Sequence, residues 1–321
     1  MMLRSVILIL FCIGPRFAFA RPLDVPAPFQ QGLEQIRSGE FQHAIETSHA
    51  LQRAFPKHPL AVLVAVEAYW GMIYCQTGHI NSQEIRNFAD AKTSPYDKDF
   101  FQAVEIALQL SQQMRLDPES AAAGALYAGV ARGARSRLYA FREQALRAAT
   151  EAKQMRADLL DAIAKDPRLA PDADLGLGTY NYYVDVLSPI LKLFRLVAGI
   201  PGGDRERGLE QLRTASEQAV LFRDEAAYEL AHIYGVREGR HSEALLLLKE
   251  LANRYPGNPV FALLAGYQAE ATGGKSAAIE YCQRVLDAAG KAADDCRERM
   301  TSAAKGALER LRGGEPPNQT N

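Results

Sequence analysis

The sequence has 321 residues, of which 48% are hydrophobic and 23% are charged, as in a folded globular protein. Its 24 glycines and 16 prolines are ordinary in number, which excludes a collagen-like or low-complexity chain. With 37 basic and 38 acidic residues, the formal net charge is −1, so the chain lacks the basic excess of most nucleic-acid-binding proteins. We therefore expect no nucleic-acid partner.

The N-terminal residues 1–20 have the pattern of a secretory signal peptide. Arg4 supplies a positive charge, an apolar run follows over 6–13, and Ala18 and Ala20 fit the small-x-small rule for cleavage. The apolar run is far shorter than the ~20 residues that span a bilayer. We expect cleavage after Ala20 and export to the periplasm or the medium, with an uncleaved anchor as the alternative.

The remainder of the chain has helical patterns. We expect an extended segment over 21–28, a helical array over 29–312 and a disordered tail over 313–321. Asp117-Pro118 and Ser94-Pro95 indicate helix starts, because Asp or Ser caps a helix and Pro fits its first turn. No stretch alternates with period two while being rich in β-branched residues, so no strand is predicted. The chain is predicted to be all-α, with about fourteen helices.

Two segments of the sequence share turn-forming and small residues at identical offsets. Gly39, Ala44, Pro56 and Pro59 recur as the same residue types within 239–259. Glycine favours the conformation that ends a helix, alanine permits two helices to approach closely, and proline stops a helix. The pattern therefore indicates a repeated unit of helix, tight turn, helix and stop.

These residues resemble the tetratricopeptide repeat, a unit of about 34 residues. One copy starts near Gly32, a second spans 231–256, and a third follows directly with Gly266, Gly273 and Ala278. The resemblance implies an α-solenoid of antiparallel helix pairs, irregular in the middle, whose concave face accepts a peptide or a helix of another protein.

A second resemblance lies in the middle of the chain. Residues 176–181 read Gly-Leu-Gly-Thr-Tyr-Asn, an apolar helix with a proline follows, and residues 199–205 read Gly-Ile-Pro-Gly-Gly-Asp-Arg, shortly before Gly208. This is similar to the signature of the tetratricopeptide repeat protein 39 family, with extra residues in the loop. The resemblance supports the helical-repeat fold. The chain is much shorter than that family's eukaryotic members, and the intracellular roles of the family are not transferred to it.

Patterns that could bind a cofactor lack their structural context. Residues 269–276 loosely match a phosphate-binding loop, but a helix precedes them and the glycines fall at a repeat turn. Gly176 and Gly178 lack the third glycine of a dinucleotide fingerprint. The histidines do not have the spacing of a helical zinc site. We therefore expect a non-catalytic protein with no cofactor and no metal.

Two further functions remain as alternatives. Tyr180, Tyr182 and Asp185 lie near the glycine loop and could belong to an uncharacterised enzyme site, although no residue pairs with them as acid or base. The apolar segment 186–200 could lie in a membrane interface, but burial between helical layers, with a kink at Pro189, is favoured. Contact with a membrane is thus possible but not expected.

The main hypothesis is an exported scaffold that binds a protein or peptide in the cell envelope. Candidate residues of a binding groove lie on the predicted first helices of two repeats: Tyr228, Glu229, His232, Tyr234, Tyr267 and Glu270. Five arginines between Arg132 and Arg147 are expected to form a solvated face, with docking of an acidic peptide or of phospholipid headgroups as the alternative.

Three cysteines remain after the predicted cleavage. Cys75 follows an apolar stretch and is expected to be a small core residue. Cys282 and Cys296 flank the small residues 288–290 at similar distances, so a turn there would bring them opposite each other. We expect a disulfide between Cys282 and Cys296 in an exported protein, with two separate thiols as the alternative.

Overall fold

The computed structural model describes residues 25–76, 93–187, 199–289 and 294–313, together with Leu23, Lys192 and Arg195. The predicted signal peptide, most of the apolar segment 186–200, the side chain of Cys296 and the predicted tail beyond Gly313 lie outside this part of the chain.

The described residues form 13 α-helices and a 3-10 turn, and they contain no strand. The elements are α1 (Ala27–Arg37), α2 (Phe41–Ala54), α3 (Pro59–Gln76), α4 (Asp97–Met114), α5 (Ala121–Phe141), α6 (Ala145–Lys165), η3 (Pro167–Leu169), α7 (Ala170–Asp185), α9 (Arg205–Gln218), α10 (Arg223–Val236), α11 (His241–Arg254), α12 (Pro259–Ala271), α13 (Lys275–Ala289) and α14 (Asp294–Gly313). Helices that follow one another pack in adjacent pairs, as expected of an α-solenoid. The first helix begins at Ala27, within the segment expected to be extended.

The glycines of the repeated unit stand at helix ends, as predicted. Gly39, Gly239 and Gly273 have φ angles of +78°, +64° and +79°, which side chains other than glycine rarely adopt. Ala44 and Ala244, the small residues of the pattern, are fully buried. Each of these three turns therefore contains a glycine at the position where the sequence pattern predicts one.

The glycines in the middle of the chain permit α7 and α9 to cross at close range. A methyl group at Gly178 would lie 2.9 Å from the backbone oxygen of Gly208, and one at Gly208 would lie 2.6 Å from the backbone nitrogen of Tyr182. A methyl group at Gly203 would lie 2.3 Å from the oxygen of Asn181. The structural interpretation of the Gly-x-Gly pattern is confirmed, because these positions leave no room for a side chain.

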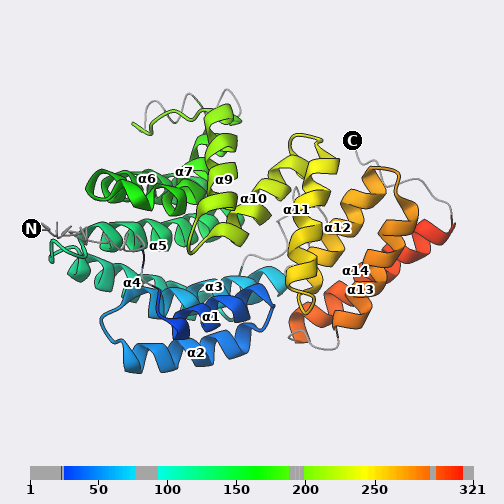
Figure 1. The fold of residues 1–321 in the computed structure, drawn as a ribbon, viewed down its shortest axis with the longest axis horizontal. Coiled ribbons are helices and arrows are strands. Elements are labelled where there is room, and N and C mark those ends of the chain that lie inside the picture. The colour runs from blue at the N-terminus through cyan, green and yellow to red at the C-terminus, as the bar shows by residue number, and fades with distance from the viewer. Residues whose placement is uncertain are drawn as a thin grey trace, which may run out of the picture.

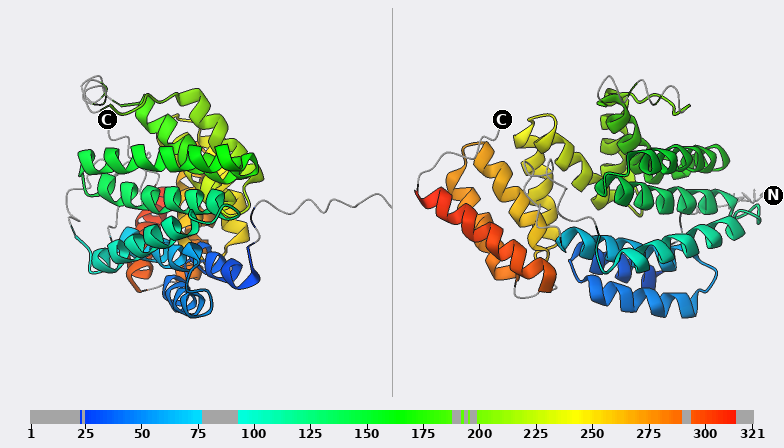
Figure 2. Two further views of the ribbon diagram at one scale, coloured as in Figure 1. Left: turned by 90° about the vertical axis from the view of Figure 1, so that its left-hand side faces the viewer. Right: turned by 180° about the vertical axis from the view of Figure 1, so that it is seen from behind.

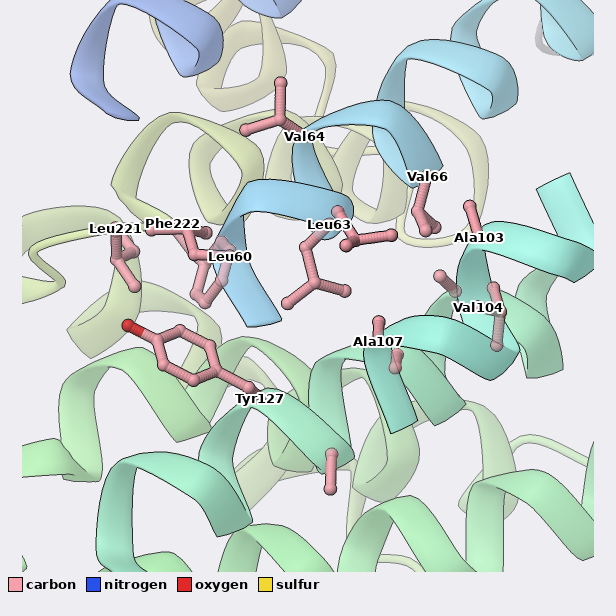
Figure 3. Packing of buried hydrophobic residues seen from close by; sticks show 14 of the residues in the cluster. Leu60, Leu63, Val64, Val66, Ala103, Val104, Ala107, Tyr127, Leu221 and Phe222 are labelled. Atoms are coloured by element: carbon pink, nitrogen blue, oxygen red, sulfur yellow. The ribbon is translucent and has the colours of Figure 1, made fainter. Parts of the chain in front are cut away.

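Helix α3 lies at the centre of the largest hydrophobic core. Figure 3 shows its residues Leu60 and Leu63 between Val104 of α4 and Phe222, which precedes α10. Because helices surround α3, it is apolar on every side. Within the described residues it is the one helix long and apolar enough to span a bilayer, but most of it is buried inside the protein, as in the core helix of a globular fold.

The N-terminal helices also contact the C-terminal half of the chain. The turn after α1 lies beside the turn before α12, where Asn258 Nδ2 donates to the backbone oxygen of Arg37 at 2.9 Å. The Arg37 guanidinium reaches Glu225 of α10 at 2.9 Å and the oxygen of Leu221 at 2.6 Å. Helix α14 packs against α3. In a simple solenoid each repeat contacts only its neighbours. Here the array closes on itself, as Figures 1 and 2 show from three sides.

Candidate functional site

Five half-buried polar side chains from three helices meet where α10 passes between the two halves of the molecule in Figure 1. We call them the tyrosine cluster: Tyr74 of α3, Tyr183 of α7, and Tyr228, Glu229 and His232 of α10. Tyr74 shares a hydrogen bond with Tyr228, and Tyr183 donates one to the Glu229 carboxylate. The charge of Glu229 raises the pKa of all three tyrosines and of His232. Three residues predicted for a groove therefore belong to one connected group.

Partial burial decides the protonation of the tyrosine cluster. Burial raises the pKa of Tyr183 and of Tyr228 well above the ordinary tyrosine value, and the charge of Glu229 adds to this effect. Burial lowers the pKa of His232, and Arg237 acts in the same direction, while Glu229 opposes them. The cluster at neutral pH therefore presents neutral hydroxyls and a neutral imidazole around one carboxylate.

Aromatic rings extend the tyrosine cluster along α3 and towards α12. The ring of Trp70 lies 6.0 Å from that of Tyr74, and the Arg137 guanidinium lies 4.3 Å above Trp70. The ring of Phe261 lies 5.9 Å from that of Tyr228. Rings with polar tips provide large contact areas at little cost in conformational entropy, which suits a binding surface.

The other predicted groove residues lie elsewhere. Tyr234 is 4% exposed, with the Arg240 guanidinium 3.8 Å above its ring and Arg213 donating to its hydroxyl at 3.1 Å. It faces α9 because it stands six residues after Tyr228, on another side of α10. Glu270 pairs with Arg310 of α14 at 2.8 Å. Tyr267 is close enough to the same arginine to help raise its pKa. The six residues predicted for the groove therefore do not line one continuous surface.

Tyr74 and Tyr183 were not singled out by the sequence. Tyr74 stands near the end of the apolar helix α3 and Tyr183 stands in a Tyr-Tyr pair, so neither carries a local signal of function. Only the packing of α3 and α7 beside α10 brings them to Glu229. Their meeting could not be inferred without knowing which distant helices are neighbours.

The arginines between Arg132 and Arg147 are balanced by acids. Arg132 pairs with Asp158 at 2.9 Å, Arg137 with Glu67 at 2.7 Å, and Arg142 with Asp97 at 2.7 Å. Arg135 contacts Glu105 and Glu151, and Arg147 donates to Gln144 at 3.0 Å. The expected solvated face is therefore present only in part: Arg137 and Arg147 are exposed, whereas Arg132, Arg135 and Arg142 are partly buried and paired with acids.

The expected disulfide of Cys282 is wrong. Cys282 is a free and buried thiol. Cys75 is a core residue, as expected, and it is also disulfide-bonded. The Cys282 Sγ lies against Gly266 of α12, 3.6 Å from where a methyl group there would be, so it faces the preceding helix. Burial raises the pKa of this thiol to about 11. The side chain of Cys296 lies outside the described residues.

The residues considered for an enzyme site have separate partners. The Tyr180 hydroxyl donates to the backbone oxygen of Pro201 at 2.7 Å, and the Tyr182 hydroxyl donates to Glu238 at 2.5 Å. Asp185 lies 3.9 Å from Lys192. Each of these groups thus has a structural contact of its own. Within the described ranges, no group of three or more His, Cys, Asp or Glu side chains could hold a metal ion.

A hollow of about 620 Å³ lies beside α9. Its lining carries charges of both signs in equal number, and the residues are Asp204, Glu206, Arg207, Leu209, Glu210, Arg213 and Arg240. A ligand of one charge has no preference for such a balanced lining. The tyrosine cluster is therefore the stronger candidate site.

Comparison with models of known protein families gives no match, and comparison with curated proteins gives no significant match. What the structure defines is a class: an all-α protein whose helices pack in adjacent pairs, in the manner of an α-solenoid.

Proposed function

We propose that this protein is an exported, non-catalytic scaffold of the tetratricopeptide-repeat type that binds a protein or peptide partner in the cell envelope. Turn glycines at positive φ and buried alanines at the same offsets support repeats built from antiparallel helix pairs. The pattern of residues 1–20 supports export. Helical arrays of this kind use their extended surfaces to bind other chains.

The observation that carries the proposal is the tyrosine cluster. Its rings are half-buried, so they retain surface for contact, while hydrogen bonds to one another and to Glu229 hold them in place. Rigid aromatic side chains with polar tips are enriched among the residues that dominate protein interfaces. A peptide lying across α10 would meet Tyr228 and His232, which are four residues apart on one helix face.

Site-specific photocrosslinking tests this proposal. A photoreactive phenylalanine would replace Tyr74, Tyr183 or Tyr228 in the full chain, and Tyr139 of α5 would serve as the matched control because it is also a half-buried tyrosine. We expect the same partner to be captured from the three cluster positions and not from position 139.

A quantitative measurement with the purified partner completes the test. Tyr228→Ala is expected to weaken binding by about tenfold or more, as for a central interface residue. Tyr139→Ala should change it less than about twofold. Equal capture from all four positions, or equal affinity of both alanine variants, would show that the tyrosine cluster is not the binding surface.

The membrane-surface alternative rests on the segment 186–200, of which the structure describes 186–187, Lys192, Arg195 and 199–200. Sedimentation with liposomes distinguishes it from the scaffold. An enzyme that uses Tyr180, Tyr182 and Asp185 has no observation in its favour, because these side chains have separate partners.

A further inference from the structure

Three cationic side chains converge on the loop 199–203. Arg195 Nη1 donates to the backbone oxygen of Ile200 at 3.1 Å and lies 3.2 Å from where a methyl group at Gly202 would be. Lys153 Nζ of α6 lies 3.7 Å from the corresponding position at Gly199. The Arg156 guanidinium, also from α6, lies 5.7 Å from the ring of Tyr180.

The loop itself is held in place beside these cations. Tyr180 of α7 donates its hydroxyl proton to the backbone oxygen of Pro201 at 2.7 Å, and Gly199 has a φ angle of +61°. The backbone nitrogen of Asp204 donates to the oxygen of Asn181 at 3.1 Å. The geometry of the loop is therefore fixed at both ends, and its glycines leave space beside the cationic groups.

The charges of these cations are not neutralised by the described residues. Lys153, Arg156 and Arg195 form no ion pair within that part of the chain, and the buried Nε of Arg195 has no hydrogen-bond partner. The neighbouring carboxylate, Asp185, lies 3.9 Å from Lys192 instead. By contrast, the half-buried arginines Arg115, Arg132, Arg135 and Arg142 all pair with acids. Arg156 and Arg195 are partly buried, whereas Lys153 is exposed. An uncompensated, partly buried positive charge such as that of the two arginines is costly unless an anion from outside the chain neutralises it.

We propose that Lys153, Arg156 and Arg195 form a binding site for a phosphate-type oxyanion above the loop 199–203. The planar guanidinium forks suit the tetrahedral oxygens of a phosphate, and the flexible lysine adds a point charge. The same chemistry occurs in a soluble phosphate monoester and in the headgroup of an anionic phospholipid. The site is distinct from the tyrosine cluster and does not depend on the scaffold proposal.

Two binding measurements on the mature full chain distinguish the two sources. Calorimetry with inorganic phosphate and with glycerol 3-phosphate measures the soluble ligands. Cosedimentation with phosphatidylcholine vesicles, with and without phosphatidylglycerol, measures the headgroup. We expect binding in at least one arm, and the arm that responds identifies the source.

Variants of α6 test the residues. Lys153→Gln combined with Arg156→Gln removes two of the charges without touching the hydrogen bond of Arg195 to Ile200, and it should weaken binding by roughly tenfold or more. Arg207→Gln combined with Lys249→Gln removes two exposed charges elsewhere and should change binding less than about twofold. Circular dichroism and thermal melting establish that both variants fold.

Two outcomes would overturn the site. The first is a parent chain that binds none of the phosphates and no more of the anionic than of the neutral vesicles. The second is a folded Lys153→Gln, Arg156→Gln variant that binds as tightly as the control variant.

Discussion

Asn258 and Arg37 are separated by 221 residues in the chain and are joined by a hydrogen bond of 2.9 Å from the asparagine side chain to the arginine backbone oxygen. The same asparagine accepts a hydrogen bond from the backbone nitrogen of Val260 at 3.0 Å and so caps α12. The side chain of Asn258 therefore caps the N-terminus of α12 and also supplies a hydrogen-bond donor to a backbone oxygen at the C-terminal end of α1. Beside it, the buried Asp224 accepts a hydrogen bond from Tyr255 at 2.6 Å and pairs with Arg254.

We expect Asn258→Ala to destabilise the protein by about 1–3 kcal/mol, because it removes both the helix cap and the bond to Arg37. Asn258→Ser keeps a capping oxygen but is too short to reach Arg37, so its loss should be smaller. Urea denaturation measures both. Asn253→Ala, which removes only an exposed contact to Arg284, is the control and should stay within about 0.5 kcal/mol of the parent. If all variants have the same free energy of unfolding, the hydrogen bond between Asn258 and Arg37 does not contribute to stability.

Two helical glycines provide a matched pair. A methyl group at Gly208 would lie 2.6 Å from the backbone nitrogen of Tyr182, whereas one at Gly306 of α14 meets nothing within 4 Å. Gly208→Ala should therefore destabilise the protein by about 2 kcal/mol or more, since α7 and α9 must move apart. Gly306→Ala should stabilise it by about 0.5–1 kcal/mol through helix propensity. Urea denaturation measures the free energy of unfolding of each variant. If α7 and α9 cross as closely as described, this free energy falls in Gly208→Ala and rises in Gly306→Ala.

Local features of the fold could be predicted from residue types. Gly39 and Gly239 were recognised as turn residues because positive φ favours glycine, and Gly178 as a contact residue because a small side chain allows close crossing. The all-α class followed from the absence of alternating strands. These predictions depend on interactions within one or two turns of helix, which a sequence displays directly.

Contacts between distant segments could not be predicted. The turns at Gly39 and Asn258 belong to two segments with similar sequence patterns, but this similarity does not indicate that the two turns touch. Likewise, the nearly equal spacing of Cys282 and Cys296 around a turn predicts a bond, but α13 is rotated so that Cys282 faces Gly266 of α12. The predicted groove joined Tyr228 and Tyr234, which lie on different sides of α10 because they are six residues apart. Each of these contacts depends on which helices are neighbours in the fold, and the local sequence pattern does not contain this information.

The stability of the protein should depend on the titration of His232. Burial lowers its pKa below the ordinary value of about 6.5, and Arg237 contributes in the same direction against Glu229. The unfolded chain therefore takes up a proton near that pH, while the folded chain does not. Stability from this group is present above about pH 6.5 and is lost as the pH falls towards the lower folded pKa.

Urea denaturation at pH 7.5 and at pH 5.5 measures this effect. The loss of unfolding free energy between the two pH values should be smaller in His232→Gln than in the parent chain. His58, whose pKa burial also lowers, is unchanged in that variant and keeps its own contribution. An identical loss in both proteins, or an imidazole of His232 that titrates above 6.5 by NMR, would contradict the assignment.

Alkylation should distinguish the free thiol of Cys282 from the disulfide-bonded Cys75. The Cys282 thiol is buried and its pKa is raised to about 11, so it should react with iodoacetamide only after denaturation. Cys75 should remain unmodified in denatured protein until a reductant is added, because it is disulfide-bonded. Mass spectrometry of alkylated peptides reads both results.

The same experiment identifies the second sulfur. We expect non-reduced digests of the full chain to contain one crosslinked peptide that includes Cys75, and its mass identifies the partner. Cys75→Ser should remove this crosslink and lower the thermal stability, because a disulfide restricts the unfolded chain. Cys282→Ser should leave the crosslink intact, because Cys282 is a free thiol. A crosslinked peptide that contains Cys282 would contradict the assignment of a free thiol.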